Sequence, residues 1–153
     1  MANTYTQVYV HLVFVVEGRQ NLITKKYKEN LNKYITGIIQ NRGHKLIIIN
    51  GMQDHIHILI GLSPDESISG LVHEVKRCAT NFINDNNYIN GKFRWQKGYA
   101  AFSYSKSNID NVYNYIKNQE IHHKERTFKE EYMELLKKFD IKFDEKYIFE
   151  DVI

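Results

Sequence analysis

The sequence predicts an α+β fold of the ferredoxin-like class, in which helices cover one face of an antiparallel sheet. Segments of strand and helix periodicity alternate in the order strand, helix, strand, strand, helix, strand, helix. A βαββαβ run of this length is typical of a ferredoxin-like sandwich, and the last helices would be C-terminal additions to it. A length of 153 residues suits one domain, which we expect to span residues 1–153.

The first half of this run contains a strand, a helix and two short strands. Residues 5–16 are rich in β-branched and aromatic side chains, which predicts a strand. Apolar residues then recur at helical spacing from a capping Thr24 to about Asn41. The apolar segments 46–49 and 55–60 predict two strands, and the intervening NGMQD favours a turn.

The second half adds a helix, extended segments and two further helices. Residues 63–84 carry a helical apolar stripe and have acidic residues near their start. Residues 93–95 and 101–105 predict extended structure. Residues 107–123, read SNIDNVYNYIKNQEIHH, and a charged segment 128–139 both predict helices.

Composition restricts the class of protein without identifying it. The net charge of +3 is compatible with a polyanionic partner, but many proteins are mildly basic. No apolar run approaches the roughly 20 residues that a transmembrane helix needs. The first nine residues are too polar for a signal peptide, so we expect a cytoplasmic protein. The single cysteine, Cys78, excludes an internal disulfide.

The segment GKFRWQKGYAAFSYSK, residues 91–106, interleaves aromatic and basic residues. Such a surface can stack on unpaired bases while its cations contact phosphates. A non-catalytic domain that binds single-stranded nucleic acid is therefore an alternative function. Composition favours the simpler interpretation, in which Phe93, Trp95, Tyr99 and Phe102 fill the core and the sheet faces.

Two histidines in DHIHILIG, residues 54–61, are the first candidates for a functional site. Side chains alternate along a strand, so His55 and His57 share one face while Ile56 and Ile58 share the other. Same-face neighbours lie roughly 6 to 7 Å apart, which allows two imidazoles to bind one metal ion. Asp54 would be a direct oxygen ligand or a partner of a liganding histidine. The alternative is a pair of hydrogen-bonded histidines on a half-exposed sheet.

A later helix offers residues that would complete such a site. Tyr115 lies off the apolar stripe of its helix, and Gln119 follows one turn later on the same side. A metal ion held by His55, His57 and Gln119 would leave positions for a phosphoryl oxygen. The Tyr115 hydroxyl could then attack phosphorus, forming a covalent phosphotyrosine and releasing a 3′-hydroxyl. Other ligand candidates, ranked below Gln119, are His11, His122 and His123.

The same motifs resemble those of the small single-tyrosine transposases of the HUH type, which compact bacterial insertion sequences encode. REP-associated tyrosine transposases are near relatives. The resemblance covers about residues 5–123, in the order YVHLVFVV, DHIHILI, SISGLVHEVKRCAT, FRWQKGYAAFSYS and YIKNQEIHH. It assigns His55 and His57 to the metal-binding pair, Tyr115 to the nucleophile and Gln119 to the additional ligand.

The resemblance also implies substrate, cofactor and assembly. We expect cleavage and rejoining of single-stranded DNA at element ends, with Mg²⁺ or Mn²⁺, through a 5′-phosphotyrosine intermediate. Short imperfect hairpins near those ends would be recognised. A homodimer is expected, in which the tyrosine helix of one subunit can complete the histidine site of the other. A host-domesticated relative that processes repetitive extragenic hairpins would share this chemistry.

DNA contacts outside the site are expected from basic side chains, each of which could equally be a solvated surface charge. Where relatives often carry a basic pair after the first strand, this chain reads EGRQ, so Glu17 is acidic there. Cations that hold phosphates would weaken DNA binding as salt rises. The candidates are Arg19, Lys76, Arg77, Arg94 and Lys97.

Overall fold

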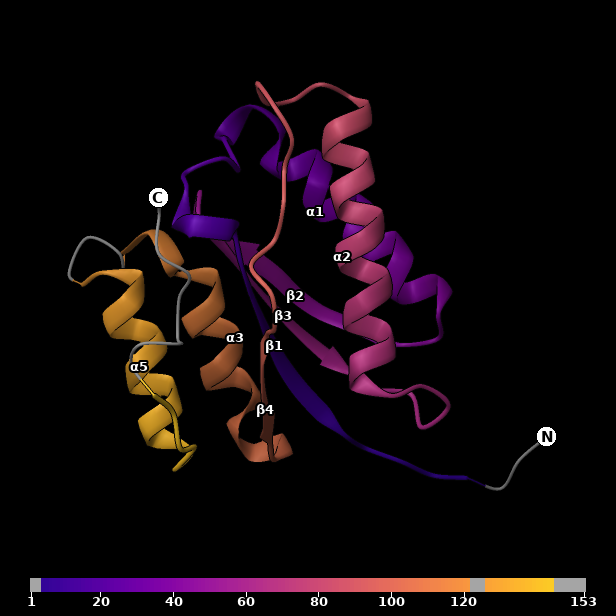
Figure 1. Ribbon diagram of the computed structural model, residues 1–153. Helices are drawn as coiled ribbons and strands as arrows, with labels where there is room; N and C mark the ends of the chain where they lie inside the picture. Colours follow the sequence, from indigo (N-terminus) through magenta and orange to yellow (C-terminus); the bar gives the residue numbers. More distant parts are fainter. Residues whose placement is uncertain (1–3, 122–125, 145–153) are drawn as a thin grey trace.

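The computed structural model describes residues 4–121 and 126–144 around a four-stranded antiparallel sheet (Figure 1). The strands lie in the order β2-β3-β1-β4, with β1 paired to both β3 and β4. This is the strand order of the predicted ferredoxin-like sandwich, so the predicted fold class is confirmed. The strands are β1 Tyr9–Val15, β2 Lys45–Gly51, β3 His55–Gly61 and β4 Ala100–Tyr104.

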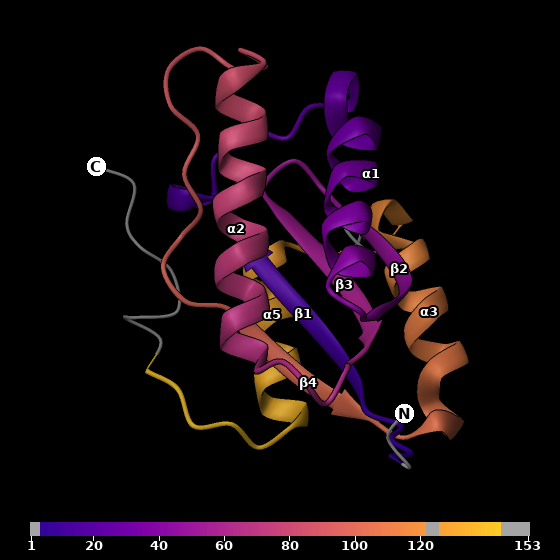
Figure 2. The same cartoon turned by 90° about the vertical axis from the view of Figure 1, so that its right-hand side faces the viewer.

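Helices α1 (Lys25–Asn41) and α2 (Ile68–Asp85) cover one face of the sheet (Figure 2). Because side chains alternate along each strand, every second residue of β1 and β3 points toward these helices. The main core therefore combines strand residues with the buried stripes of both helices. From the strands it takes Val10, Leu12 and Phe14 of β1, and Ile56, Ile58 and Ile60 of β3.

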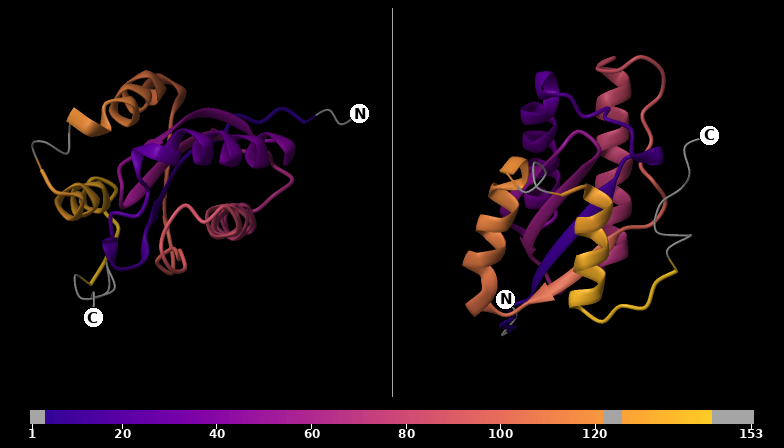
Figure 3. Two further views of the ribbon diagram at one scale, coloured as in Figure 1. Left: turned by 90° about the horizontal axis from the view of Figure 1, so that it is seen from above. Right: turned by 90° about the vertical axis from the view of Figure 1, so that its left-hand side faces the viewer.

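The C-terminal helices α3 (Ile109–Lys117) and α5 (Phe128–Lys138) cover the opposite face (Figure 3). Val112 and Ile116 of α3 pack on Leu59, and α5 packs on the central strand β1 and the edge strand β4. The predicted additional helices thus make a third layer, and the odd residues of β1 and β3 lie beneath it. No helix among the described residues is long and apolar enough to cross a membrane.

The structure corrects several predicted boundaries. Strand β1 begins at Tyr9, four residues later than predicted, because the preceding residues are exposed and outside the sheet ladder. Residues 93–95 form no strand and add only a single bridge between Trp95 and Val16. Two short 3-10 turns, Glu17–Arg19 and Lys106–Asn108, follow β1 and β4.

Helix α3 is shorter than predicted. It ends at Lys117, where the Asn50 side-chain amide donates hydrogen bonds to the carbonyls of Ile116 (3.0 Å) and Lys117 (3.1 Å). A turn at Asn118 follows before helical structure resumes at Gln119. Asn50 therefore caps the helix end with a side chain from β2, a long-range contact that the helical spacing of residues 107–123 does not reveal.

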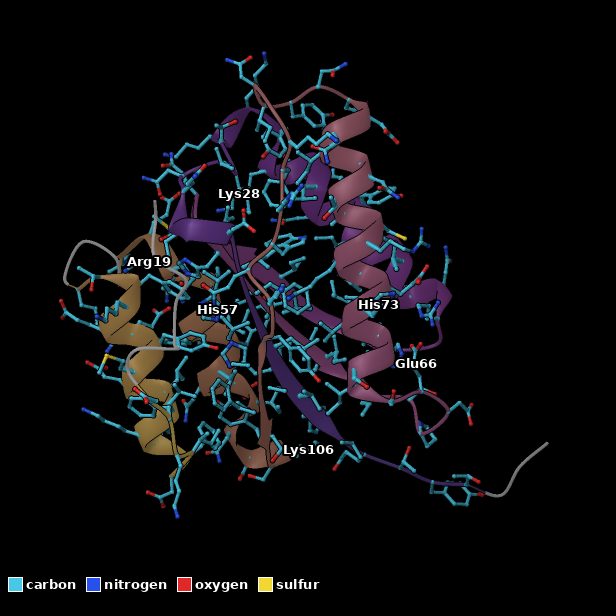
Figure 4. The ribbon with its side chains drawn as sticks, in the orientation of Figure 1. Arg19, Lys28, His57, Glu66, His73 and Lys106 are labelled. Atoms are coloured by element: carbon cyan, nitrogen blue, oxygen red, sulfur yellow. The ribbon has the colours of Figure 1, made fainter. Side chains whose placement is uncertain are left out.

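A partly buried ionic network joins the end of α1 to the start of α2, where Figure 4 labels Glu66. The Ser63 backbone N–H donates to His44 Nδ1 (2.9 Å), so His44 Nε2 carries the proton that it donates to Glu66 (2.8 Å). Arg42 also donates to Glu66. These hydrogen bonds, that of Arg42 above all, lower the pKa of the Glu66 carboxyl to about 2.

Glu66→Gln is expected to destabilise the protein at neutral pH and to reduce its sensitivity to acid. A carboxyl with a lowered pKa stabilises the fold above its usual pKa, and this contribution is lost as the pH falls from 4.5 toward 2. Because Arg42 is 38% exposed, we expect a loss of only about 1 kcal/mol at pH 7. Urea unfolding between pH 7 and 3 measures both effects. The exposed neighbour variant Asp65→Asn should leave the pH profile unchanged.

Candidate active site

His55 and His57 lie on the face of the sheet that α3 and α5 cover, and both side chains are fully buried. Figure 4 labels His57. The other face of β3 carries Ile56 and Ile58, so the predicted alternation is confirmed. Asp54 lies 2.7 Å from His55 Nδ1 and accepts its proton, which directs His55 Nε2 toward the interior of the site. Asp54 is therefore the orienting partner of His55.

His57 is held from its far side by His11 of β1. Its Nδ1 lies 2.7 Å from His11 Nε2, and the two rings stack with centroids 4.9 Å apart. Burial, and then proximity to His57, lowers the pKa of His11 well below its usual value, so His11 is neutral. A neutral His11 can accept the Nδ1 proton of His57, which is the tautomer that presents Nε2 to a ligand. His11, an alternative ligand candidate in the sequence analysis, therefore lies on the Nδ1 side of His57, away from its Nε2 atom.

Two buried oxygen-bearing side chains face the histidine Nε2 atoms. Gln119 Oε1 lies 3.1 Å from His55 Nε2, so Gln119 is where the sequence places it. Glu131 Oε1 lies 3.0 Å from His57 Nε2 and 3.7 Å from His55 Nε2. The ligand atoms of His55, His57 and Glu131 all lie within 4.8 Å of one another. This buried His-His-Glu group could hold a metal ion, and its mixture of nitrogen and oxygen donors fits a divalent one.

Glu131 is the residue that the sequence interpretation missed. It follows Lys129 and Glu130 on α5 and looks like part of a charged surface. A signal was nevertheless present, because position 131 falls three residues after Phe128 and one before Tyr132. These aromatic residues belong to the buried stripe of α5, so residue 131 also faces the sheet.

Tyr115 of α3 stands beside the histidines within the same chain. Its ring contacts His57 edge-on, with centroids 5.9 Å apart, and lies 6.4 Å from His11. Burial, and then the charge of Glu131, raises the pKa of the Tyr115 hydroxyl. Together with Glu131, Tyr115 lines a cavity of about 650 Å³ between β4, α3 and α5. One chain therefore brings together the tyrosine and both histidines, without the second copy that the sequence interpretation allowed for.

Two of the predicted DNA-contact residues lie on the opposite side of the sheet from this site. Helix α2, which carries Lys76 and Arg77, packs on the opposite face of the sheet. The Lys76 ammonium donates to the carbonyls of Gln96 (2.9 Å) and Gly98, and burial lowers its pKa to about 8. Arg77 pairs with Glu74. Arg94 and Lys97 are exposed in the loop before β4, and Arg19 follows β1 (Figure 4).

The aromatic residues of segment 91–106 belong mainly to the core. Phe93, Trp95 and Phe102 are buried, whereas Tyr99 is 39% exposed. A stacking platform for bases needs exposed rings. The structure therefore favours the core interpretation of this segment. The remaining ligand candidates, His122 and His123, lie outside the described residues.

A ferredoxin-like sheet that carries a buried histidine pair beside a tyrosine defines a candidate metal-dependent enzyme. Comparison with known families is consistent with this class. The family model described as "Transposase IS200 like" matches residues 4–119, and the chain belongs to this family. Membership implies a DNA-processing enzyme.

Individual relatives are similar along most of the chain. The ISDra2 transposase TnpA of Deinococcus radiodurans is 23% identical over 118 residues, which cover 74% of this chain and 84% of the relative. A crystal structure of a putative transposase from the same organism superposes with a TM-score of 0.61 at 19% identity, covering 78% of this chain and 95% of that one. The structure of a REP-associated tyrosine transposase bound to a REP hairpin superposes with a TM-score of 0.62 at 14% identity. The match covers 80% of this chain and 73% of that one.

Proposed function

We propose that this chain is a DNA transposase that cleaves and rejoins single-stranded DNA at insertion-sequence ends. Tyr115 would be the nucleophile, and His55, His57 and Gln119 would hold a divalent ion, Mg²⁺ or Mn²⁺. The observation that carries the proposal is the convergence of Tyr115 and the two histidines in a chain of the IS200-like transposase family.

The protein side chains divide the chemistry between them. Tyr115 supplies the oxygen that attacks phosphorus, so that a phosphotyrosine bond forms as the P–O3′ bond breaks. The 3′-hydroxyl leaves with a proton and can later attack the phosphotyrosine to reverse the exchange. A divalent ion held by the histidines would polarise the phosphoryl group and stabilise its charge. Because one phosphate ester replaces another, the exchange needs no ATP.

Several residues would orient the reacting groups. His11 and Asp54 fix the orientation of His57 and His55 through the ring nitrogens that face away from the centre. The raised pKa of the Tyr115 hydroxyl means that its proton must be removed as the bond to phosphorus forms.

Membership of the family also suggests a substrate and an oligomeric state, which we propose for this chain. The relative bound to a REP hairpin supports a hairpin-bearing single strand as the ligand. A homodimer is proposed as well, although one chain already holds Tyr115 beside His57. Contacts from Arg19, Lys76, Arg77, Arg94 and Lys97 to phosphates would make DNA binding weaken as salt rises.

The function is tested by incubating the protein and Mn²⁺ with single-stranded DNA from the two flanks of its gene. An adduct that resists denaturation is expected, and chelator should prevent it. A label at the 3′ end of the strand should stay with the protein, whereas a label at the 5′ end should be released on a fragment ending in a 3′-hydroxyl. Chelator-resistant binding without any adduct would instead indicate a non-catalytic single-strand binding domain. Flanking hairpins at both gene ends would distinguish a mobile element from a domesticated relative.

A further inference from the structure

We propose that Glu131 of α5 is itself a metal ligand, so that the buried site holds its ion with two histidines, Gln119 and this carboxylate. The inference deepens the proposed function and rests on it for the presence of a divalent ion. It assigns α5, which lies beyond the family match at residues 4–119, a direct part in the metal centre.

Three separations between the donor atoms are compatible with ligands around one ion. Two ligands each about 2.1 Å from a metal lie about 3.0 to 3.6 Å apart when their angle at the metal is 90 to 120°. The separation between His57 Nε2 and Glu131 Oε1 is 3.0 Å, and that between His55 Nε2 and Gln119 Oε1 is 3.1 Å. The separation between His55 Nε2 and Glu131 Oε1 is 3.7 Å, close to the upper end of this range.

The histidine tautomers support the same assignment. Asp54 accepts the Nδ1 proton of His55, and in the tautomer in which His11 accepts the Nδ1 proton of His57 both Nε2 lone pairs point to the interior. In this state each lone pair faces an oxygen acceptor, Gln119 Oε1 or Glu131 Oε1. A nitrogen lone pair and an oxygen repel each other at this distance unless a proton or a cation lies between them. Without a metal ion, the other tautomer of His57 lets its Nε2–H donate to Glu131 Oε1. A metal ion satisfies all four donors at once.

Burial makes the Glu131 carboxylate depend on the charges and donors around it. The Glu131 side chain has no exposed surface, and neither do His55, His57 and Gln119. A buried carboxylate is strongly destabilising unless a charge or several donors compensate it. The apolar stripe of α5 could be completed by a hydrophobic residue at this position, yet the helix carries an acid that points at two histidines. A ligand role accounts for both the burial and the direction of Glu131.

The donor set also indicates which ions the buried site would prefer. Two imidazole nitrogens suit Mn²⁺, Co²⁺ or Zn²⁺ better than Mg²⁺, which favours oxygen ligands and retains several waters. The four side chains are buried, and the Phe128 ring covers His55 with centroids 3.8 Å apart. We therefore expect tight binding of Mn²⁺ or Co²⁺ in the absence of DNA.

Metal binding to the DNA-free protein tests the assignment. Glu131→Gln keeps the size of the side chain but replaces its anionic ligand, and Mn²⁺ affinity by calorimetry is expected to fall at least about tenfold. The visible absorption of bound Co²⁺, which reports coordination, should change as well. Glu134→Gln is the matched control, because it removes one charge from the exposed side of the same helix. Affinity and spectrum equal to those of the control would overturn the proposal.

A second measurement uses the wild-type protein and so does not depend on the variant folding. If Glu131 is a ligand, the metal links α5 to β3, and amide hydrogen exchange in residues 128–138 should slow when Mn²⁺ is added. Unchanged or faster exchange there would contradict the proposal. These tests need no DNA, so Glu131-dependent metal binding without any DNA adduct would refute only the transposase function. An adduct-forming protein with Glu131-independent metal binding would refute only this inference.

Discussion

Tyr115→Phe is expected to abolish the covalent protein–DNA adduct, with a loss of at least about 1,000-fold in its rate of formation. The substitution removes the attacking oxygen but keeps the ring that packs between α3 and the histidines. Metal binding and fold stability should therefore stay close to those of the wild type. Denaturing gel electrophoresis of labelled DNA measures the adduct, and calorimetry measures the metal.

The chain offers a close control for this variant. Tyr113 lies on the same helix but is 37% exposed and points away from the site, so Tyr113→Phe should form adduct at the wild-type rate. Tyr104 lines the same cavity, with its ring 6.1 Å from that of His11. An adduct that persists in Tyr115→Phe and disappears in Tyr104→Phe would show that the nucleophile had been assigned to the wrong tyrosine.

The parts of the site that the sequence predicts are those that local geometry determines. His55 and His57 share a face because the strand repeat is two residues, and this holds wherever the strand packs. Tyr115 and Gln119 are four residues apart, so even a helix interrupted at Asn118 leaves them close to each other and to the histidines. Strand and helix periodicity also depends only on neighbouring residues, which explains why the predicted order of strands and helices is confirmed.

The residues that the sequence does not reveal depend on packing between distant segments. Glu131 becomes part of the site only because α5 docks on β1 and β4, more than 70 residues from His57 in sequence. The partnership of His11 with His57 likewise depends on the register in which Val13 of β1 pairs with His57. Residues 93–95 have strand-like composition, but their aromatic rings fill the core instead of extending the sheet.

The proximity of Tyr115 to His57 within one chain changes what a dimer would have to contribute. The sequence resemblance allowed the tyrosine helix to come from a second subunit, whereas here α3 packs on Leu59 of its own sheet. A dimer in which subunits exchange these helices would rebuild the same contacts between chains. Mixing Tyr115→Phe with His57→Ala protein tests this, because only exchanged helices would restore adduct formation in the mixture.

His57→Ala is expected to have the largest effect on stability of any single substitution in the site, about 3 to 5 kcal/mol measured in chelator. The imidazole bridges His11 and Glu131 in a region without exposed surface. Its removal leaves a cavity and takes from the buried Glu131 carboxylate its 3.0 Å nitrogen partner. Metal binding should also be lost, because one of the two nitrogen ligands is gone.

The double variant His57→Ala/Glu131→Gln separates these two effects. Replacing the carboxylate by a neutral amide removes the uncompensated charge, so about 1 to 3 kcal/mol of the lost stability should return in urea unfolding. Metal binding should not return, because the double variant lacks both groups. If the stability losses of the two single variants add up to that of the double variant, the energetic contribution of the Glu131 carboxylate does not depend on His57. A recovery of stability in chelator, together with weaker metal binding by Glu131→Gln alone, would mean that the Glu131 carboxylate pairs with His57 when the ion is absent and binds the ion when it is present.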